Sequence, residues 1–316
     1  MEARTAVAAL ILACAALIAS PSSAMPPPAD PLLASFGSVV SDEIHDLAFD
    51  AAGNLYVSGH IGNAGRIFKI TPTGLTSEFL GFSSLDDARG IAFDQAGGLY
   101  IADAGYDPAR STGRVLRVAS GGTLAVVASG LRWPTSCALG PDGNLYVAEP
   151  LTGSIERVTP AGAVSAYAGG FSGPGESLGA LAFGEDGALY AGVGGRIVRV
   201  GSGGTPVTTI VTGLDEVMGL LPYGAVFFVA TYGHHDLRFV SASGSVSRLT
   251  NPALADPCVD GPIPAGASVS LPAGMRLHDG RVYVVDQGCH RIRVFDVALP
   301  VSAIPTTWGA LKAHYR

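Results

Sequence analysis

The chain has 316 residues, of which 48% are hydrophobic and only 14% are charged, and it contains 43 glycines and 21 prolines. The net charge of −7 gives no electrostatic basis for binding nucleic acid. Low charge and abundant glycine suit an all-β protein with many tight turns, because glycine readily adopts the positive φ that such turns require.

The first 24 residues have the pattern of a secretory signal peptide. Arg4 precedes an apolar run over residues 5–19, and Ser22 and Ala24 place small residues before a cleavage point after Ala24. The run is short for a membrane span, so we expect no transmembrane segment. We predict an exported protein that is secreted, periplasmic or held at the cell surface, with residues 25–31 as a proline-rich linker. Lipidation at Cys14 is the alternative.

A repeating unit occupies residues 32–298. Each unit contains an apolar triplet, a short turn, a strand with an aromatic residue, a strand of alternating polar and apolar residues, and usually a glycine turn before an outer strand. The triplets lie at 47–49, 91–93, 137–139, 181–183, 219–221 and 275–277, and the aromatic residues are Tyr56, Tyr100, Tyr146, Tyr190, Phe228 and Tyr283. The mean spacing of about 45 residues is the length of a four-stranded blade, so six units predict a six-bladed β-propeller.

The sixth unit lacks an outer strand, since Pro300 follows soon after its third strand. Residues 32–40 have the outer-strand pattern and precede the first inner strand, so we predict that this N-terminal strand completes the last blade and closes the ring. The repeated aromatic residues are expected to pack between blades. Arg276 stands where four other units have alanine, and it requires a carboxylate partner or water there.

The tail over residues 299–316 follows the last unit. Trp308, Leu311 and Tyr315 have the spacing of one face of a short amphipathic helix. We expect a frayed terminus there, with a short amphipathic helix as the alternative.

Three cysteines follow the signal peptide. Cys258 lies in the long loop before the sixth unit and Cys289 lies between its second and third strands, so both belong to connections at the same rim. We predict a disulfide between them, as an oxidising compartment would allow. Cys137 occupies an inner-strand position held by leucine or isoleucine in other units, and it is predicted to be a buried free thiol.

Binding residues are expected at the rim that carries the longer and more variable connections. The candidates there are Asp46, Arg89, Asp103, Trp133, Glu149, Glu176, Tyr232, His234, Arg276 and Asp286. Asp103, Glu149 and Asp286 end equivalent second strands. They are expected either to form an acidic mouth for a cation or polar ligand, or to accept hydrogen bonds that hold the loop following each strand.

Residues 284–296, VVDQGCHRIRVFD, resemble the NHL-repeat consensus, and residues 142–149, DGNLYVAE, resemble it in the same way. This resemblance covers residues 32–298 and implies a six-bladed propeller. In the similar gluconolactonase-like family, a Glu, an Asn and an Asp hold a divalent metal at the axis. Here the corresponding motifs are replaced by residues 42–46 (DEIHD) and 134–136 (PTS), and Asp286 alone could stand for the aspartate.

The similar streptogramin-lyase and peptidyl-hydroxyglycine-lyase propellers use histidines and a metal at the same face. Several histidines of this chain are expected in or near the loops of that rim, namely His45, His60, His234, His235 and His290. They do not occupy equivalent positions in the repeats.

From these observations we predict a monomeric binding module that takes a small polar ligand or a protein partner at the loop-rich rim. The alternative is a metal-assisted hydrolase, similar to lactonases, or a lyase, with a divalent cation near the axis. Neither hypothesis involves nucleic acid.

Overall fold

The computed structural model describes residues 32–38, 41–62, 64–81, 84–105, 112–173 and 175–297. The predicted signal peptide, linker and C-terminal tail lie outside these residues. Within the described ranges, no helix has the length and apolar character needed to cross a membrane.

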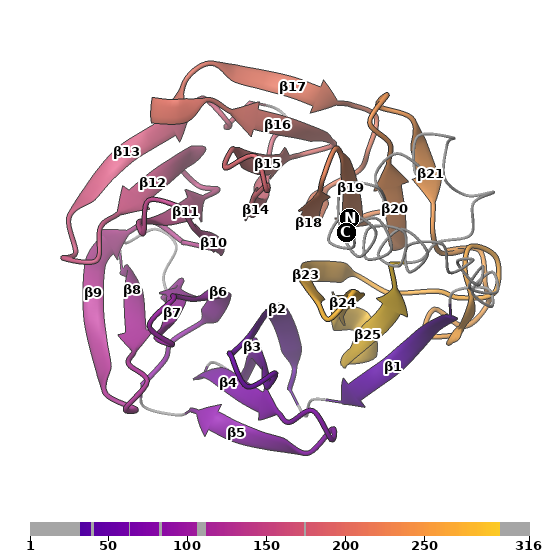
Figure 1. The fold of residues 1–316 in the computed structure, drawn as a ribbon, viewed down its shortest axis with the longest axis horizontal. Coiled ribbons are helices and arrows are strands. Elements are labelled where there is room, and N and C mark those ends of the chain that lie inside the picture. Colours follow the sequence, from indigo (N-terminus) through magenta and orange to yellow (C-terminus); the bar gives the residue numbers. More distant parts are fainter. Residues whose placement is uncertain are drawn as a thin grey trace, which may run out of the picture.

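Six antiparallel sheets surround a central axis, as the sequence predicted (Figure 1). Blade one contains β2 (Glu43–Phe49), β3 (Leu55–Ile61), β4 (Ala64–Ile70) and β5 (Thr76–Leu80). Blade two contains β6 (Ala88–Phe93), β7 (Leu99–Asp103), β8 (Gly113–Val118) and β9 (Leu124–Leu131). Blade three contains β10 (Ser136–Leu139), β11 (Leu145–Glu149), β12 (Ser154–Val158) and β13 (Val164–Gly169). In each of these blades the first strand lies nearest the axis.

The remaining blades follow the same order. Blade four contains β14 (Leu178–Phe183), β15 (Leu189–Val193), β16 (Arg196–Val200) and β17 (Val207–Val211). Blade five contains β18 (Val217–Tyr223), β19 (Val226–Thr231), β20 (Asp236–Val240) and β21 (Val246–Arg248). Blade six contains β23 (Pro272–His278), β24 (Arg281–Asp286) and β25 (Arg291–Asp296). Two short 3-10 turns lie between strands, η1 (Ser202–Gly204) in blade four and η2 (Gln287–Cys289) in blade six.

The N-terminal strand closes the ring, as predicted. β1 (Leu32–Ser38) pairs antiparallel with β25, with Ala34 opposite Val294 and a bulge between Ser35 and Gly37. The two-residue strand β22 (Gly261–Pro262) pairs with the start of β1 and extends this sheet to five strands. Blade six is therefore assembled from both ends of the propeller and from the loop that precedes it.

In blade five, the triplet that is equivalent to those of the other blades lies one residue later than the sequence predicted. Leu220 is opposite Val229, as Leu47 is opposite Val57 in blade one. The triplet of blade five is therefore 220–222. The sequence placed it at 219–221 because the connection to the second strand is one residue shorter here, with Pro222 opposite Phe227, than in blade one, where Phe49 is opposite Leu55.

Hydrophobic clusters fill the spaces between neighbouring blades, as in the cluster that joins blades three and four. The predicted packing of the repeated aromatic residues between blades is confirmed for Tyr146, which meets Phe183 of the next blade edge-to-face at 5.1 Å. The hydroxyl of Tyr146 donates to Asp142 in the turn of its own blade at 2.9 Å. Tyr146 thus joins two blades through its ring and fixes a turn through its hydroxyl.

The predicted disulfide between Cys258 and Cys289 is present, with the two Cα atoms 5.8 Å apart. It ties the loop before blade six to the connection between the second and third strands of that blade. Beneath this loop lies Arg293, which is fully buried and donates hydrogen bonds to the carbonyls of Val259 and Ser268. Cys137 is a buried free thiol, as predicted.

Candidate functional site

A cavity of about 120 Å³ opens on the axis at the loop-rich rim. The first residues of the inner strands of several blades form its wall, because these strands lie closest to the axis. Four of the rim candidates named from the sequence lie together here, namely Asp46, Arg89, Tyr232 and Arg276.

Arg276 forms the floor of this cavity and has the carboxylate partner that the sequence required. Its guanidinium donates to Asp46 at 2.9 Å, to the carbonyl of Ile91 at 3.2 Å and to that of Met275 at 2.8 Å. Asp46 also accepts the backbone N–H groups of Leu47 and Ile91. Burial raises the pKa of Asp46, and the nearby Arg276 opposes this shift.

A second axial cavity of about 360 Å³ opens at the opposite rim, and Arg276 and Met275 line both cavities. The ends of the inner strands, including Phe93 and Phe183, form its wall. The Arg276–Asp46 pair therefore divides the axial space into a mouth at each rim.

The wall of the first cavity contains a hydroxyl with an unused hydrogen-bonding capacity. The Oγ1 atom of Thr135 is buried and has no hydrogen-bond partner among the described residues. The next residue, Ser136, accepts the backbone N–H of Leu181 at 3.1 Å and so links blades three and four. Thr135 lines the cavity, so a rotation of its side chain would bring this hydroxyl within reach of a polar ligand or water there.

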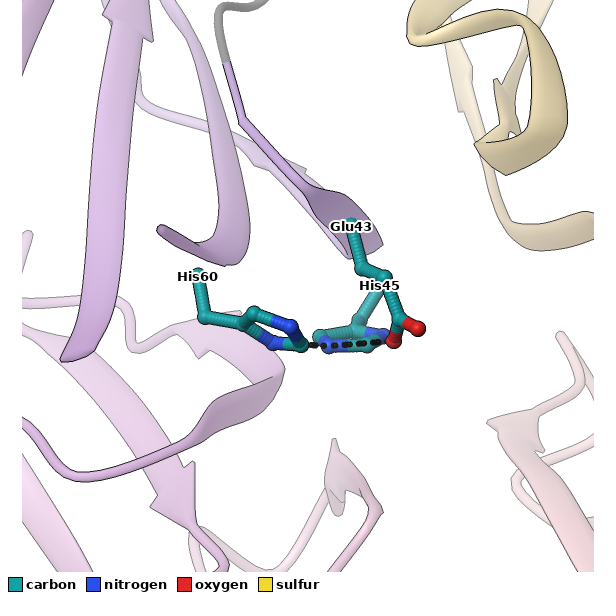
Figure 2. A group of neighbouring side chains, drawn as sticks. All are labelled: Glu43, His45 and His60. Carbon is teal, nitrogen blue, oxygen red and sulfur yellow. Dashed lines mark hydrogen bonds and ion pairs between the residues drawn. The ribbon is translucent and has the colours of Figure 1, made fainter. Parts of the chain in front are cut away.

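Two histidines and two carboxylates meet beside the cavity, and Glu43 and His45 belong to its wall. Figure 2 shows the imidazoles of His45 and His60 directed toward each other, with the Glu43 carboxylate beyond His45. The Nε2 atom of His45 lies 3.4 Å from Nδ1 of His60 and 3.9 Å from Oε2 of Glu43. The Oδ1 atom of Asp87 lies 3.8 Å from each of these two nitrogens.

Burial lowers the pKa of His45 well below its ordinary value, and Arg89 and His60 add to this effect. The His45 imidazole is therefore neutral at neutral pH, with a nitrogen lone pair available as an acceptor or ligand atom.

Arg89 fixes the orientation of the Asp87 carboxylate. Its Nε donates to Oδ2 of Asp87 at 2.7 Å, which leaves Oδ1 facing the histidines. The Arg89 guanidinium lies 5.0 Å from the centre of the Trp133 ring, an arrangement suited to a cation–π contact. Arg89 and Trp133 therefore act together at the rim, although only Arg89 lines the cavity.

Asp103, Glu149 and Asp286 are buried at the ends of their second strands. Each accepts backbone N–H hydrogen bonds from the loop that leads into its own blade. The donors are Asp86 and Asp87 for Asp103, Arg132 for Glu149 and Ser270 for Asp286. The preceding loop therefore supplies donors that the sequence did not suggest. The expected hydrogen bonds from the following loop are present for two of the three: Glu149 accepts from the hydroxyl of Thr152, and Asp286 accepts from the backbone N–H of Cys289.

Desolvation governs the titration of these three carboxyl groups. Burial raises the pKa of Asp103 and Glu149, and it raises the pKa of Asp286 to about 6. Hydrogen bonds from the loop backbone oppose the shift in each case.

Glu176 and His234 are engaged with residues outside the axial cavity. Glu176 pairs with Arg196 at 2.5 Å. His234 lies 3.3 Å from Asp215 and 3.0 Å from Arg238. The two other rim histidines that the sequence singled out are also apart from the cluster: Nδ1 of His235 accepts the backbone N–H of Leu271, and His290 is exposed after η2.

Sequence reasoning did not single out Asp87, and it named Glu43 only within a replaced motif. Asp87 lies two residues before Arg89, in the loop that leads into blade two. This spacing suggests a carboxylate–arginine pair but does not indicate that the second carboxylate oxygen reaches histidines of blade one. The strand pairing of Glu43 with His60 was the available signal, since cross-strand partners lie on one face.

The fold and this cavity define a six-bladed β-propeller with a small polar mouth at one end of its axis. No protein-family model matches the sequence, and no curated protein matches it in sequence. Solved structures with the same fold include a virginiamycin B lyase from Staphylococcus aureus, at 16% identity and a TM-score of 0.60, with 82% of each chain covered.

Two further structural neighbours have different descriptions. An auxiliary nutrient binding protein from Bacteroides ovatus is 15% identical, with a TM-score of 0.68 over 84% of this chain and 76% of that one. A structural-genomics target named for a proposed gluconolactonase activity is 15% identical, with a TM-score of 0.64 over 86% of this chain and 96% of that one. At these identities the likeness establishes the propeller fold alone, and propellers host many functions.

Proposed function

We propose that this protein is a binding module that holds a small polar end group of its ligand in the axial cavity at the loop-rich rim. The observation that carries this proposal is the Thr135 hydroxyl, which is buried on the cavity wall with no hydrogen-bond partner among the described residues. After rotation of the Thr135 side chain, a polar ligand atom in the cavity would satisfy it.

The size of the cavity favours an end group over a whole drug-sized ligand. Its 120 Å³ corresponds to about four water volumes, whereas pockets for drug-sized molecules begin near about 300 Å³. The remainder of the ligand would then lie across the rim, where Trp133 and Tyr232 offer amphipathic surfaces.

The charges near the cavity do not favour an anionic group. Arg276 is paired with Asp46 and Arg89 with Asp87, so the two cations are balanced by neighbouring carboxylates. A ligand with a single strong charge would have to compete with one of these pairs, whereas a group with both donors and acceptors would not.

The structural neighbours include two proteins that are described as auxiliary nutrient binding proteins. A binding role for this chain is compatible with that description. A disulfide is typical of proteins outside the cytoplasm, so the Cys258–Cys289 bond supports an exported location for this module.

The test compares two tryptophan variants, one at each mouth of the axis. M218W fills the loop-rich mouth, and L277W fills the opposite mouth. Wild type and both variants are screened by thermal shift and calorimetry against sugars, sugar acids, amino acids and short peptides in the presence of EDTA. A ligand at 100 times its Kd adds about 2.7 kcal/mol to stability, which a thermal shift detects.

We expect the shift to be lost in M218W, retained in L277W and reduced in T135V, which removes only the Thr135 hydroxyl. A ligand that stabilises M218W as strongly as wild type would show that binding occurs elsewhere.

A metal-assisted hydrolase or lyase is the second candidate, because Glu43 and His45 line the cavity and belong to a group that could hold a metal. This candidate predicts turnover of a lactone or related substrate that requires added metal and is abolished in M218W. Ligand binding without turnover would favour the binding module.

A further inference from the structure

The group of Glu43, His45, His60 and Asp87 is built by strand pairing in blade one and by the loop that leads into blade two. Glu43 and His60 are cross-strand partners on β2 and β3, so their side chains lie on one face. His45 lies in the bulge between Ile44 and Leu47, and its Nε2 atom lies 3.4 Å from Nδ1 of His60. Asp87 approaches this face from the next blade.

The three closest ligand atoms form a nearly regular triangle. The sides are 3.4 Å between the two histidine nitrogens and 3.8 Å from each nitrogen to Oδ1 of Asp87. The centre of this triangle lies about 2.1 Å from each atom, which is the bond length of zinc to imidazole nitrogen or carboxylate oxygen.

The two imidazoles form a hydrogen bond to each other at 3.4 Å, but this bond does not account for the position of Asp87. Oδ1 of Asp87 is buried and has no hydrogen-bond partner among the described residues, and 3.8 Å is too long for a hydrogen bond to either imidazole. Arg89 offsets the charge of the Asp87 carboxylate through Oδ2, but the desolvated Oδ1 faces two imidazole nitrogens and has no donor or cation of its own among the described residues.

The surroundings hold Asp87 in this position. Arg89 binds its other carboxylate oxygen, and Asp103 accepts its backbone N–H at 2.7 Å. Such supporting contacts are typical of metal ligands whose orientation is fixed in advance.

We propose that Glu43, His45, His60 and Asp87 form a binding site for a divalent transition-metal ion of the zinc type. Two imidazoles with two carboxylates suit zinc and neighbouring first-row ions, whereas calcium and magnesium prefer oxygen ligands alone. The ligands come from one blade and the adjoining loop, not from equivalent positions around the axis. The site does not depend on the polar ligand proposed above, although it adjoins the same cavity.

The test titrates tag-free, EDTA-treated and dialysed protein with ZnCl₂ in competition with a fluorescent zinc chelator. We expect one equivalent of zinc to bind, and we expect H60Q to weaken this binding by at least about 100-fold. R89M, which removes only the group that orients Asp87, is expected to weaken it by about 10-fold. H278Q, which changes a histidine at the opposite rim, is expected to bind as wild type does. MgCl₂ and CaCl₂ at equal concentration should not displace zinc.

X-ray absorption at the zinc edge provides a measurement that needs no variant. Two imidazole ligands with oxygen ligands are expected for the wild-type protein. The proposal is overturned if no stoichiometric site is found, if folded H60Q binds zinc like wild type, or if the spectrum contains no imidazole. Because zinc alone is the probe, failure here leaves the ligand screen in EDTA unaffected.

Discussion

Removal of the Arg276 side chain tests whether the axial ion pair stabilises the propeller. In R276M the methionine retains much of the apolar length of the side chain but leaves Asp46 without its counter-ion. Asp46 would keep the backbone N–H groups of Leu47 and Ile91 as its remaining donors. Since burial already raises the pKa of Asp46, loss of the cation makes its ionised form less favourable still.

The structure sets the size of this effect. Breaking a buried ion pair by removing one partner costs about 3–5 kcal/mol, because a buried charge loses its compensation. The Asp46 side chain is 10% exposed and that of Arg276 is 28% exposed, so solvent would recover part of the loss. We therefore expect R276M to lower the free energy of unfolding by about 2–4 kcal/mol. At roughly 2 °C per kcal/mol for a domain of this size, Tm should fall by about 4–8 °C.

The assay is urea unfolding and thermal melting at pH 7 in EDTA, with R281M as the matched control. Arg281 pairs with Asp296 in the same blade, but their side chains are 57% and 64% exposed, so its removal should cost less than about 1 kcal/mol. The double variant D46N/R276M, which removes both charges, should be more stable than R276M alone. An effect of R276M no larger than that of R281M would refute the reasoning.

Three further predictions concern the loop, a buried carboxyl and the free thiol. C289S should lower stability by about 3–4 kcal/mol under non-reducing conditions, because the Cys258–Cys289 bond closes a segment with a sequence separation of 31; a change below about 1 kcal/mol in urea unfolding would contradict this estimate. Burial raises the pKa of Asp286 to about 6, so its contribution to stability is present below about pH 4 and is lost as pH rises through 6. The stability of wild type relative to D286N, measured by denaturation from pH 4 to 7, should therefore decline by up to about 3 kcal/mol, and a rise would have the wrong sign. Cys137 is fully buried, and burial raises the pKa of its thiol, so the folded protein should react with a maleimide only after unfolding; rapid labelling of the native state would disprove its burial.

The fold was predictable because the same local pattern recurs six times. Tyr56 and its equivalents give the blade spacing, and the missing outer strand of the last unit indicated that the N-terminal strand closes the ring. The error at blade five arose because the connection between its first two strands is one residue shorter than in blades one to four, so counting back from the aromatic strand gave the wrong triplet. A repeat thus identifies the blades more reliably than it aligns residues within one blade.

In the candidate site, only residues that depart from the repeat pattern could be predicted from the sequence. Arg276 was conspicuous because alanine occupies the equivalent place in four other blades, and its need for a carboxylate partner followed from the cost of burying a charge. Asp87 disturbs no pattern, since an acidic residue in a loop is ordinary. Its role depends on which of its two oxygens Arg89 binds, and this is a property of the folded loop that residue spacing does not encode.

The pairing of β1 with β25 has a consequence for synthesis of the chain. β1 ends at Ser38 and its partner begins at Arg291, so a ribosome adding about 5–20 residues per second needs roughly 10–50 s to deliver the second strand after the first. During this interval β1 presents unpaired backbone groups that another chain could bind. β1 is thus the first of these strands to be synthesised, but the sheet of blade six is complete only after β25 has been made. Until then, the N-terminal part of the nascent chain needs protection from pairing with other chains.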